Sequence, residues 1–125
     1  MILDTNAISA LAAKNPDLHK RIAPSTRVAT TLISLGEYQF GLLGSAYRRE
    51  LVQWIEALLT KIDLLQPNTQ TLPHYAAIRH ELKTAGTPIP ANDVWIAALA
   101  RQHRMPLVSK DRHFDLVNGI ERIDW

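Results

Sequence analysis

Residues 1–6, Met1-Ile2-Leu3-Asp4-Thr5-Asn6, decide the fold. Two apolar residues end in an acid, and apolar side chains at Ile8, Leu11 and Ala12 then recur at helical spacing. This pattern predicts a short strand that opens directly into a helix. Asp4 is therefore expected at the carboxyl end of a strand.

The same order of strand and helix recurs along the chain. The β-branched run 27–31 leads into Ser34-Leu35-Gly36-Glu37, which predicts a second junction of this kind. Further strands are expected at 62–65, 106–109 and 120–123, and further helices at 47–62, 69–85 and from Asn92 to Ala100. Strands that alternate with helices favour the α/β class, an α/β/α sandwich around a central, mostly parallel sheet.

Length and composition limit what the protein does. With 125 residues, 46% of them hydrophobic, the chain fits one domain, 1–125, with a buried core, and a large modular enzyme is excluded. The absence of cysteine excludes disulfides, thiolate metal sites and cysteine nucleophiles. Met1 to Lys14 has neither the basic start of a signal peptide nor an apolar run long enough for a membrane span, so we expect a cytoplasmic protein with no membrane partner.

Four acids occupy comparable places in this arrangement: Asp4, Glu37, Asp93 and Asp111. Each follows a predicted strand or begins a predicted helix, and ligands of open parallel sheets bind outside the carboxyl ends of the strands. Carboxylates that converge there repel one another unless a divalent cation binds them, which implies Mg²⁺ or Mn²⁺. Such a site suits hydrolysis of a phosphodiester. Three neighbouring polar residues are expected to support the carboxylates by hydrogen bonds: Thr5, Asn6 and Ser109.

Each acid also has a structural alternative. Asp4 is a good N-cap for the helix that follows it, and Ser34-Leu35-Gly36-Glu37 matches a capping box in which the glutamate binds the N-cap amide. Asp93 suits the first turn of a helix through the helix dipole, and Asp111 suits an Asx turn. The argument for a site therefore depends on the four acids together.

Four blocks of sequence carry a resemblance to a known family. They are Ile2-Leu3-Asp4-Thr5-Asn6, Ser34-Leu35-Gly36-Glu37-Tyr38-Gln39-Phe40-Gly41, Asn92-Asp93-Val94-Trp95-Ile96-Ala97-Ala98 and Leu107-Val108-Ser109-Lys110-Asp111-Arg112-His113-Phe114. In this order they resemble the blocks of PIN-domain ribonucleases, and among these the VapC-type toxins of bacterial toxin–antitoxin pairs. The resemblance covers essentially the whole chain.

The resemblance implies a metal-dependent endoribonuclease with a PIN-like fold. It assigns Asp4, Glu37, Asp93 and Asp111 to an acidic quartet, of which the three aspartates hold Mg²⁺ or Mn²⁺ around an attacking water. It also implies an RNA substrate, a cognate antitoxin and a homodimer. His113 departs from the pattern because many relatives have an acid there, so Asp115 is an alternative to Asp111 as the fourth acid.

Charge agrees with a nucleic-acid partner. The chain has 14 basic and 12 acidic residues, a net charge of +2, and removing the quartet leaves 12 − 4 = 8 acids and a net charge of 14 − 8 = +6 for the remainder. Lys110 and Arg112 flank Asp111 and are the best candidates for phosphate contacts.

Three other functions fit parts of the sequence. One is a catalytically silent module of the same fold that binds RNA or a protein. A response-regulator receiver has a similar length but needs paired acids near its first strand, where Thr5 and Asn6 follow Asp4. A haloacid-dehalogenase-like phosphatase needs a second aspartate where Asn6 stands.

Overall fold

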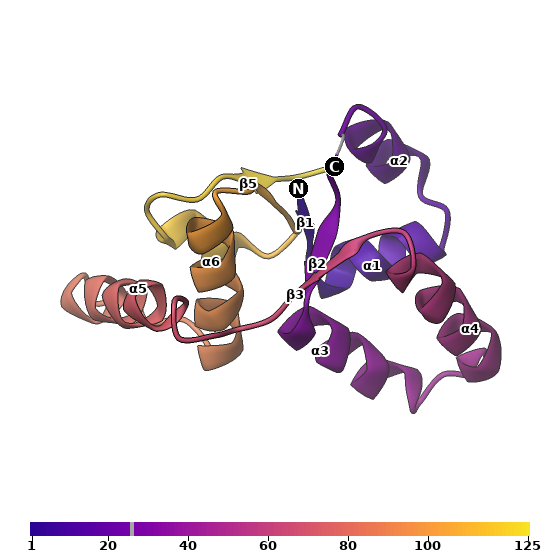
Figure 1. The fold of residues 1–125 in the computed structure, drawn as a ribbon, viewed down its shortest axis with the longest axis horizontal. Helices are drawn as coiled ribbons and strands as arrows, with labels where there is room; N and C mark the ends of the chain where they lie inside the picture. Colours follow the sequence, from indigo (N-terminus) through magenta and orange to yellow (C-terminus); the bar gives the residue numbers. More distant parts are fainter. Residues whose placement is uncertain (26) are drawn as a thin grey trace.

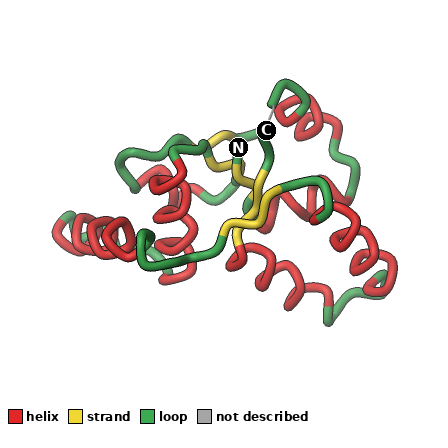
Figure 2. Tube along the Cα trace, viewed as in Figure 1, coloured by secondary structure: helices red, strands yellow, loops and turns green. Residues whose placement is uncertain are grey.

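The structure is a computed structural model that describes residues 1–25 and 27–125. Figure 2 shows short strands in the middle of the molecule, with helices around them. The strands are β1 (Ile2–Leu3), β2 (Ala29–Thr31), β3 (Asp63–Leu65), β4 (Leu107–Val108) and β5 (Arg122–Ile123). The helices are α1 (Thr5–Ala12), α2 (Pro16–Ile22), α3 (Leu32–Leu42), α4 (Arg48–Leu59), α5 (Leu72–Thr84), α6 (Ala91–His103) and the 3-10 helix η1 (Arg112–Leu116).

In the described part of the chain, the strands form one sheet in the order β3-β2-β1-β4-β5. Every neighbouring pair is parallel, and Ile2 of β1 pairs with Ala29 of β2 and with Leu107 of β4. This confirms the predicted α/β class with a parallel sheet. A receiver has β1 between β2 and β3, so the observed order excludes that alternative.

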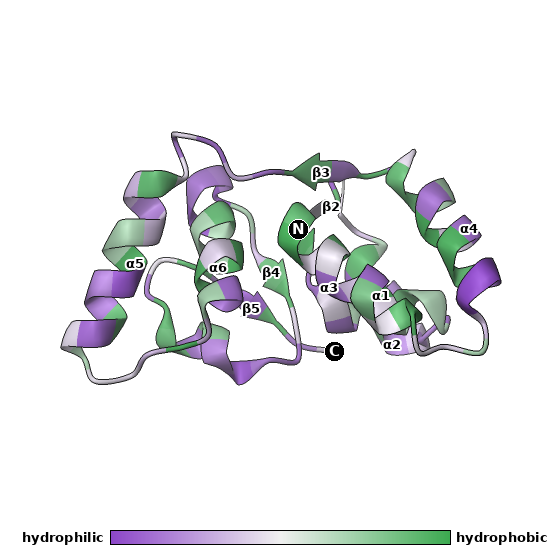
Figure 3. Ribbon diagram, turned by 90° about the horizontal axis from the view of Figure 1, so that it is seen from below, coloured by the Kyte–Doolittle hydropathy of each residue, from purple (hydrophilic) through white to green (hydrophobic). Residues whose placement is uncertain are grey.

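Each face of the sheet has its own core. Ile2 and Leu107 pack in the cluster formed with α5 and α6, whereas Leu3 and Val108 pack in the cluster formed with α1, α3 and α4. Figure 1 and Figure 3 show α5 and α6 on one side of the strands and α1 to α4 on the other. Because successive side chains of a strand point to opposite faces, two residues per strand are enough to join both layers.

The structure differs from the prediction at the starts of two helices, α2 and α3. The chain from 13 to 25 contains α2, which our sequence analysis did not predict, and Asn15 accepts hydrogen bonds from two amides of its first turn while Pro16 occupies its first position. Helix α3 begins at Leu32 and is capped by Thr31, not by Ser34. Glu37 therefore lies in the second turn of α3, and its capping-box alternative is wrong.

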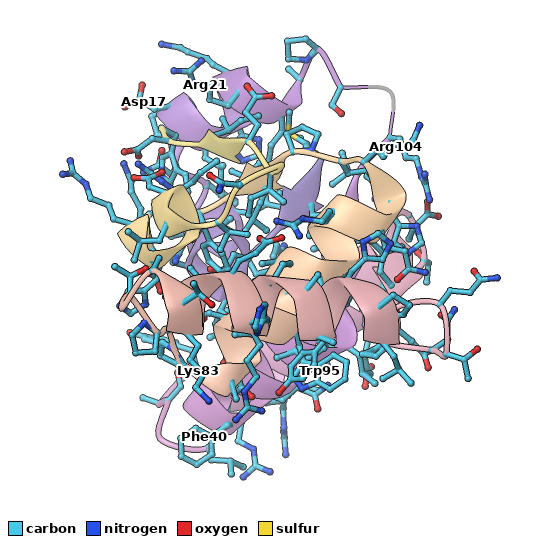
Figure 4. All side chains as sticks on the ribbon, turned by 90° about the vertical axis from the view of Figure 1, so that its left-hand side faces the viewer. Asp17, Arg21, Phe40, Lys83, Trp95 and Arg104 are labelled. Carbon is cyan, nitrogen blue, oxygen red and sulfur yellow. The ribbon has the colours of Figure 1, made fainter. Side chains whose placement is uncertain are left out.

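Helix α6 is the most deeply buried helix that the structure describes. Seven of its residues are buried, because it lies between the sheet and α5. Tyr75 of α5 stacks on Trp95 of α6, with ring centroids 4.0 Å apart, and Figure 4 shows Trp95 at the edge of α5. Gly86 follows α5 with φ of +73°, as expected for the residue that ends a helix. None of the described helices combines the length and apolar character that a membrane span requires.

Candidate active site

Asp4 is a buried carboxylate at the carboxyl end of β1. Only 5% of it is exposed, and its side chain makes no capping hydrogen bond to α1 within the described structure. Instead Ser109, which follows β4, donates to Asp4 Oδ2 at 2.7 Å, and Ser34 of α3 donates to Oδ1 at 3.2 Å. Asp4 therefore occupies the N-cap position of α1, as its structural alternative predicts, but its side chain joins three parts of the chain and does not cap the helix.

Two polar residues hold the donors to Asp4 in place. Thr31 Oγ1 donates to Ser34 Oγ at 2.9 Å and accepts from the Ser34 amide, so the α3 cap also orients Ser34. Asn6 Nδ2 lies 3.4 Å from Asp4 Oδ2 and 3.3 Å from Ser109 Oγ, and Asn6 Oδ1 accepts from the Lys110 amide at 3.0 Å. Asn6 and Ser109 thus support the carboxylate as expected.

Glu37 projects from α3 between α1 and α6. Its Oε2 accepts from Thr5 Oγ1 and its Oε1 from Asn92 Nδ2, both at 2.9 Å. Thr5 directly follows Asp4 and Asn92 directly precedes Asp93, so Glu37 is connected to the neighbours of two other acids. A half-buried carboxylate held at both oxygens keeps a defined direction.

Asp93, Asp111 and His113 form a group of carboxylate and imidazole side chains that could hold a metal ion. Each offers one ligand atom within 4.8 Å of the others. His113 Nδ1 lies 3.0 Å from Asp93 Oδ2 and 3.2 Å from Asp111 Oδ1. Asp111 Oδ1 also accepts from the His113 amide at 2.9 Å, so the Asx-turn interpretation of Asp111 is confirmed alongside its place in this group.

The carboxyl groups perturb one another's protonation. Burial raises the pKa of Asp4, and the charge of Glu37 raises it further against the hydrogen bonds from the two serines. Burial also raises the pKa of Asp93, the charges of Asp111 and Asp4 add to this, and His113 opposes it. The hydrogen bond to Asp93 raises the pKa of His113. All four predicted acids are therefore close enough to belong to one connected site.

The donor set fits a divalent cation. Carboxylate oxygens suit Mg²⁺ and Mn²⁺, and neighbouring ligands of an octahedral ion at about 2.1 Å lie about 3 Å apart. The distances from His113 Nδ1 to the two carboxylates match this spacing. Burial and neighbouring carboxylates raise the pKa values of Asp4 and Asp93, and the positive charge of a bound ion would oppose both effects.

Asp111, and not Asp115, lies with Asp93. The Asp115 carboxylate pairs with Arg122 through Oδ1 at 2.7 Å and Oδ2 at 3.0 Å, and Arg122 also donates to the Ser109 carbonyl at 3.1 Å. Asp115 thus ties η1 to β5 and to the end of β4. The Lys110 ammonium is bound by Asp124 at 2.6 Å and by the Trp125 carbonyl, whereas Arg112 is exposed.

Three residues of the site were not assigned a part in it by the sequence analysis. The sequence pattern indicates Ser34 as a helix cap, Asn92 as a helix start and Arg122 as part of an edge strand. Ser34 and Asn92 each lie beside a predicted helix start at the edge of the sheet where the acids are expected, and this position could have indicated a part in the site. Nothing in the sequence brings Arg122 to η1, because that contact needs the parallel pairing of β4 and β5.

Comparisons with known proteins place this chain in one group. A family model described as PIN domain matches residues 1–120. Ribonuclease VapC1 of Haemophilus influenzae (strain R2866) is 30% identical over 99% of this chain and 96% of its own length. The tRNA(fMet)-specific endonuclease VapC of Salmonella typhimurium is 29% identical over 99% of this chain and 96% of its own.

A solved structure agrees with the sequence comparison. It is that of VapBC-5 from Mycobacterium tuberculosis, described as a member of the VapBC family of toxin-antitoxin systems. One of its chains superposes with a TM-score of 0.75 and 28% identity, covering 99% of this chain and 97% of that one.

We predict that Asp93→Asn stabilises the fold in metal-free buffer at neutral pH. A carboxyl whose pKa is raised by folding costs stability once the pH exceeds its unfolded value, about 3.9, and the cost is complete above the folded value. Asp93→Asn should therefore be more stable than the parent at neutral pH, and the difference in stability should disappear near pH 3.5. Melting curves test this, since about 1 kcal/mol moves the Tm of such a chain by roughly 3–5 °C.

Asp17→Asn is the matched control. Asp17 is exposed in the first turn of α2, so the same chemical change there should not raise Tm. A lower Tm for Asp93→Asn at neutral pH would contradict the cost of burying the Asp93 charge beside other carboxylates.

Proposed function

The chain belongs to the PIN domain family, and we propose that it is a metal-dependent endoribonuclease, the toxin of a toxin–antitoxin pair. The observation that carries this proposal is the group of Asp93, Asp111 and His113 within 4.8 Å, with Asp4 buried beside it. The relatives named as ribonuclease and tRNA-specific endonuclease support RNA as the substrate.

Asp4, Asp93 and Asp111 would hold Mg²⁺ or Mn²⁺. When bound, such an ion polarises a phosphoryl oxygen and neutralises charge that develops on the phosphate. Ser109 and Ser34 favour the ionised form of Asp4 by donating to its two oxygens, which opposes the effect of burial on its pKa. The helix dipole at the start of α6 favours the ionised form of Asp93.

Glu37 would position the water that attacks phosphorus. Its oxygens each accept one hydrogen bond, and a carboxylate oxygen has a further lone pair for a water proton. As the new phosphorus–oxygen bond forms, the attacking water would lose a proton to Glu37, the bond to the leaving ribose oxygen would break, and that oxygen would take up a proton from solvent. Arg112, exposed beside Asp111, would contact an RNA phosphate.

We predict that Asp4→Asn and Asp93→Asn each lower RNA cleavage by at least about 100-fold, or about 2.7 kcal/mol of transition-state stabilisation. The substitutions remove charge from the cation site and leave the shape of the side chain. Cleavage is measured on a set of labelled RNAs that includes initiator tRNA, with Mg²⁺ or Mn²⁺.

Asp17→Asn, at an exposed acid on α2, should keep the parent activity. Equal cleavage by the parent and by both site variants would end the nuclease assignment. RNA binding without cleavage, unchanged by EDTA, would favour the silent module instead.

An apolar groove beside Glu37 suits the antitoxin. A cavity of about 350 Å³ lies between α1, α3 and α4. Its walls include Ala12, Gly41, Leu42 and Leu51, and it extends to Glu37. An amphipathic helix or tail of the antitoxin would bury apolar side chains there, and its end would then lie over the acids.

We predict that Gly41→Arg weakens antitoxin binding by about a hundredfold, roughly 3 kcal/mol. A Cβ at Gly41 meets nothing within 4 Å, so a larger side chain enters the groove without disturbing the fold. Titration with the protein encoded beside this chain's gene measures the effect, and Gly44→Arg, also unobstructed, is the control outside the groove. Unchanged affinity for Gly41→Arg would place the antitoxin elsewhere.

An exposed apolar stripe on α3 suits a second copy of the chain. Leu32, Gly36 and Phe40 lie four residues apart and therefore on one face of the helix. Phe40 is 79% exposed and Leu32 45%, and Figure 4 shows Phe40 projecting from the edge of the molecule. An open hollow of about 520 Å³ lies between these residues and Asn92. A projecting ring beside a hollow on the same surface suits a two-fold interface.

We predict that Phe40→Ser weakens self-association by roughly 30-fold, about 2 kcal/mol, because large apolar side chains dominate such interfaces. Light scattering over a concentration series measures it. Leu72→Ser, at an exposed apolar residue of α5, should leave the association unchanged. A parent chain that stays monomeric at every concentration would exclude the dimer.

A further inference from the structure

His113 is an exposed residue whose ring faces two carboxylates of the site. Its ring nitrogen Nδ1 lies between two carboxylates, 3.0 Å from Asp93 and 3.2 Å from Asp111. The side chain is 49% exposed, whereas that of Asp93 is 13% exposed. The imidazole therefore reaches inward with one nitrogen from a solvent-accessible position.

Three contacts fix the backbone around His113. Phe114, the next residue, is 1% exposed and packs in the core with α5 and α6. Asp111 caps η1 by accepting from the His113 amide. Two residues later, Asp115 pairs with Arg122. An imidazole on such a fixed turn loses little freedom when it binds an ion.

We propose that His113 binds the catalytic cation directly through Nδ1 and makes the site select Mn²⁺ or a similar transition metal over Mg²⁺. The proposal rests on the proposed function, because it concerns the ion that Asp4, Asp93 and Asp111 hold. Nδ1 lies 3.0 Å from Asp93 Oδ2 and 3.2 Å from Asp111 Oδ1, close to the separation of about 3 Å between neighbouring ligands of one octahedral ion. Ligand atoms of all three residues lie within 4.8 Å of one another.

The chemistry of the donor set gives the selectivity. Mg²⁺ prefers oxygen ligands and keeps several waters, so an imidazole in its coordination sphere adds little to its binding. First-row transition metals accept imidazole nitrogen, and their affinity for mixed nitrogen and oxygen sites rises along the series from Mn²⁺. One nitrogen ligand among carboxylates therefore increases the affinity of the site for transition metals more than its affinity for Mg²⁺.

Pulsed EPR of the full chain loaded with Mn²⁺ tests the contact. We expect echo modulation from a directly bound ¹⁴N nucleus in the parent, and its loss in His113→Asp, which keeps an oxygen ligand for the ion. His80→Gln, at an exposed histidine of α5, should leave the modulation unchanged. Mn²⁺ that is bound without nitrogen modulation in the parent, or modulation that persists in His113→Asp, would overturn the proposal.

Calorimetric titration with Mn²⁺ and Mg²⁺ tests the selectivity. His113→Asp should lower the preference for Mn²⁺ by about tenfold or more, and an unchanged ratio of the two Kd values would refute it. Asp93→Asn separates this inference from the proposed function. If Mn²⁺ binding needs Asp93 but shows no nitrogen, only the assignment of His113 fails. If Mn²⁺ does not bind at all, both fail.

Discussion

The hydrogen bond from Ser109 to Asp4, 2.7 Å long, holds the site together. It connects the ends of β1 and β4, which are 105 residues apart in the chain. A buried carboxylate is stable only if donors replace the water that it loses. Ser34 supplies the second donor. Because the buried Asp4 carboxylate needs both donors, β4 and α3 must each lie close to the end of β1. Ser109 Oγ also accepts from the Asp111 amide at 3.0 Å, which extends the same constraint to η1.

Much of this arrangement could be predicted from the sequence because it follows from parallel strands. Asp4 and Asp111 follow strands whose carboxyl ends meet, and Asp93 begins a helix at the same edge. The alternation of apolar runs also gave the parallel sheet and its two layers. These features need only local patterns and one topological rule.

The remaining features depend on contacts that no local pattern contains. Capping by Thr31 and not by Ser34 moved Glu37 into the second turn of α3. Both Asp115 and Asp111 follow the strand at Leu107, so the sequence does not distinguish them as the fourth acid. The pairing of Arg122 with Asp115 separates their roles. The inward direction of the His113 ring depends on the η1 turn and on the burial of Phe114.

Helix α2 is a different case, because the sequence contains a local signal for it: Asn15-Pro16-Asp17 is a recognisable helix start.

The two-residue strands have a consequence for how such a protein can evolve. Ile2 and Leu3 face opposite cores, and Asp4 follows at once. A shift of β1 by one residue against its neighbours would exchange the two cores and move the carboxylate into an apolar layer. An insertion or deletion between Ile2 and Asp4 would therefore disrupt core packing and the acidic site in one step. Loops away from the acids can change length, but the number of residues from Ile2-Leu3 to Asp4 cannot.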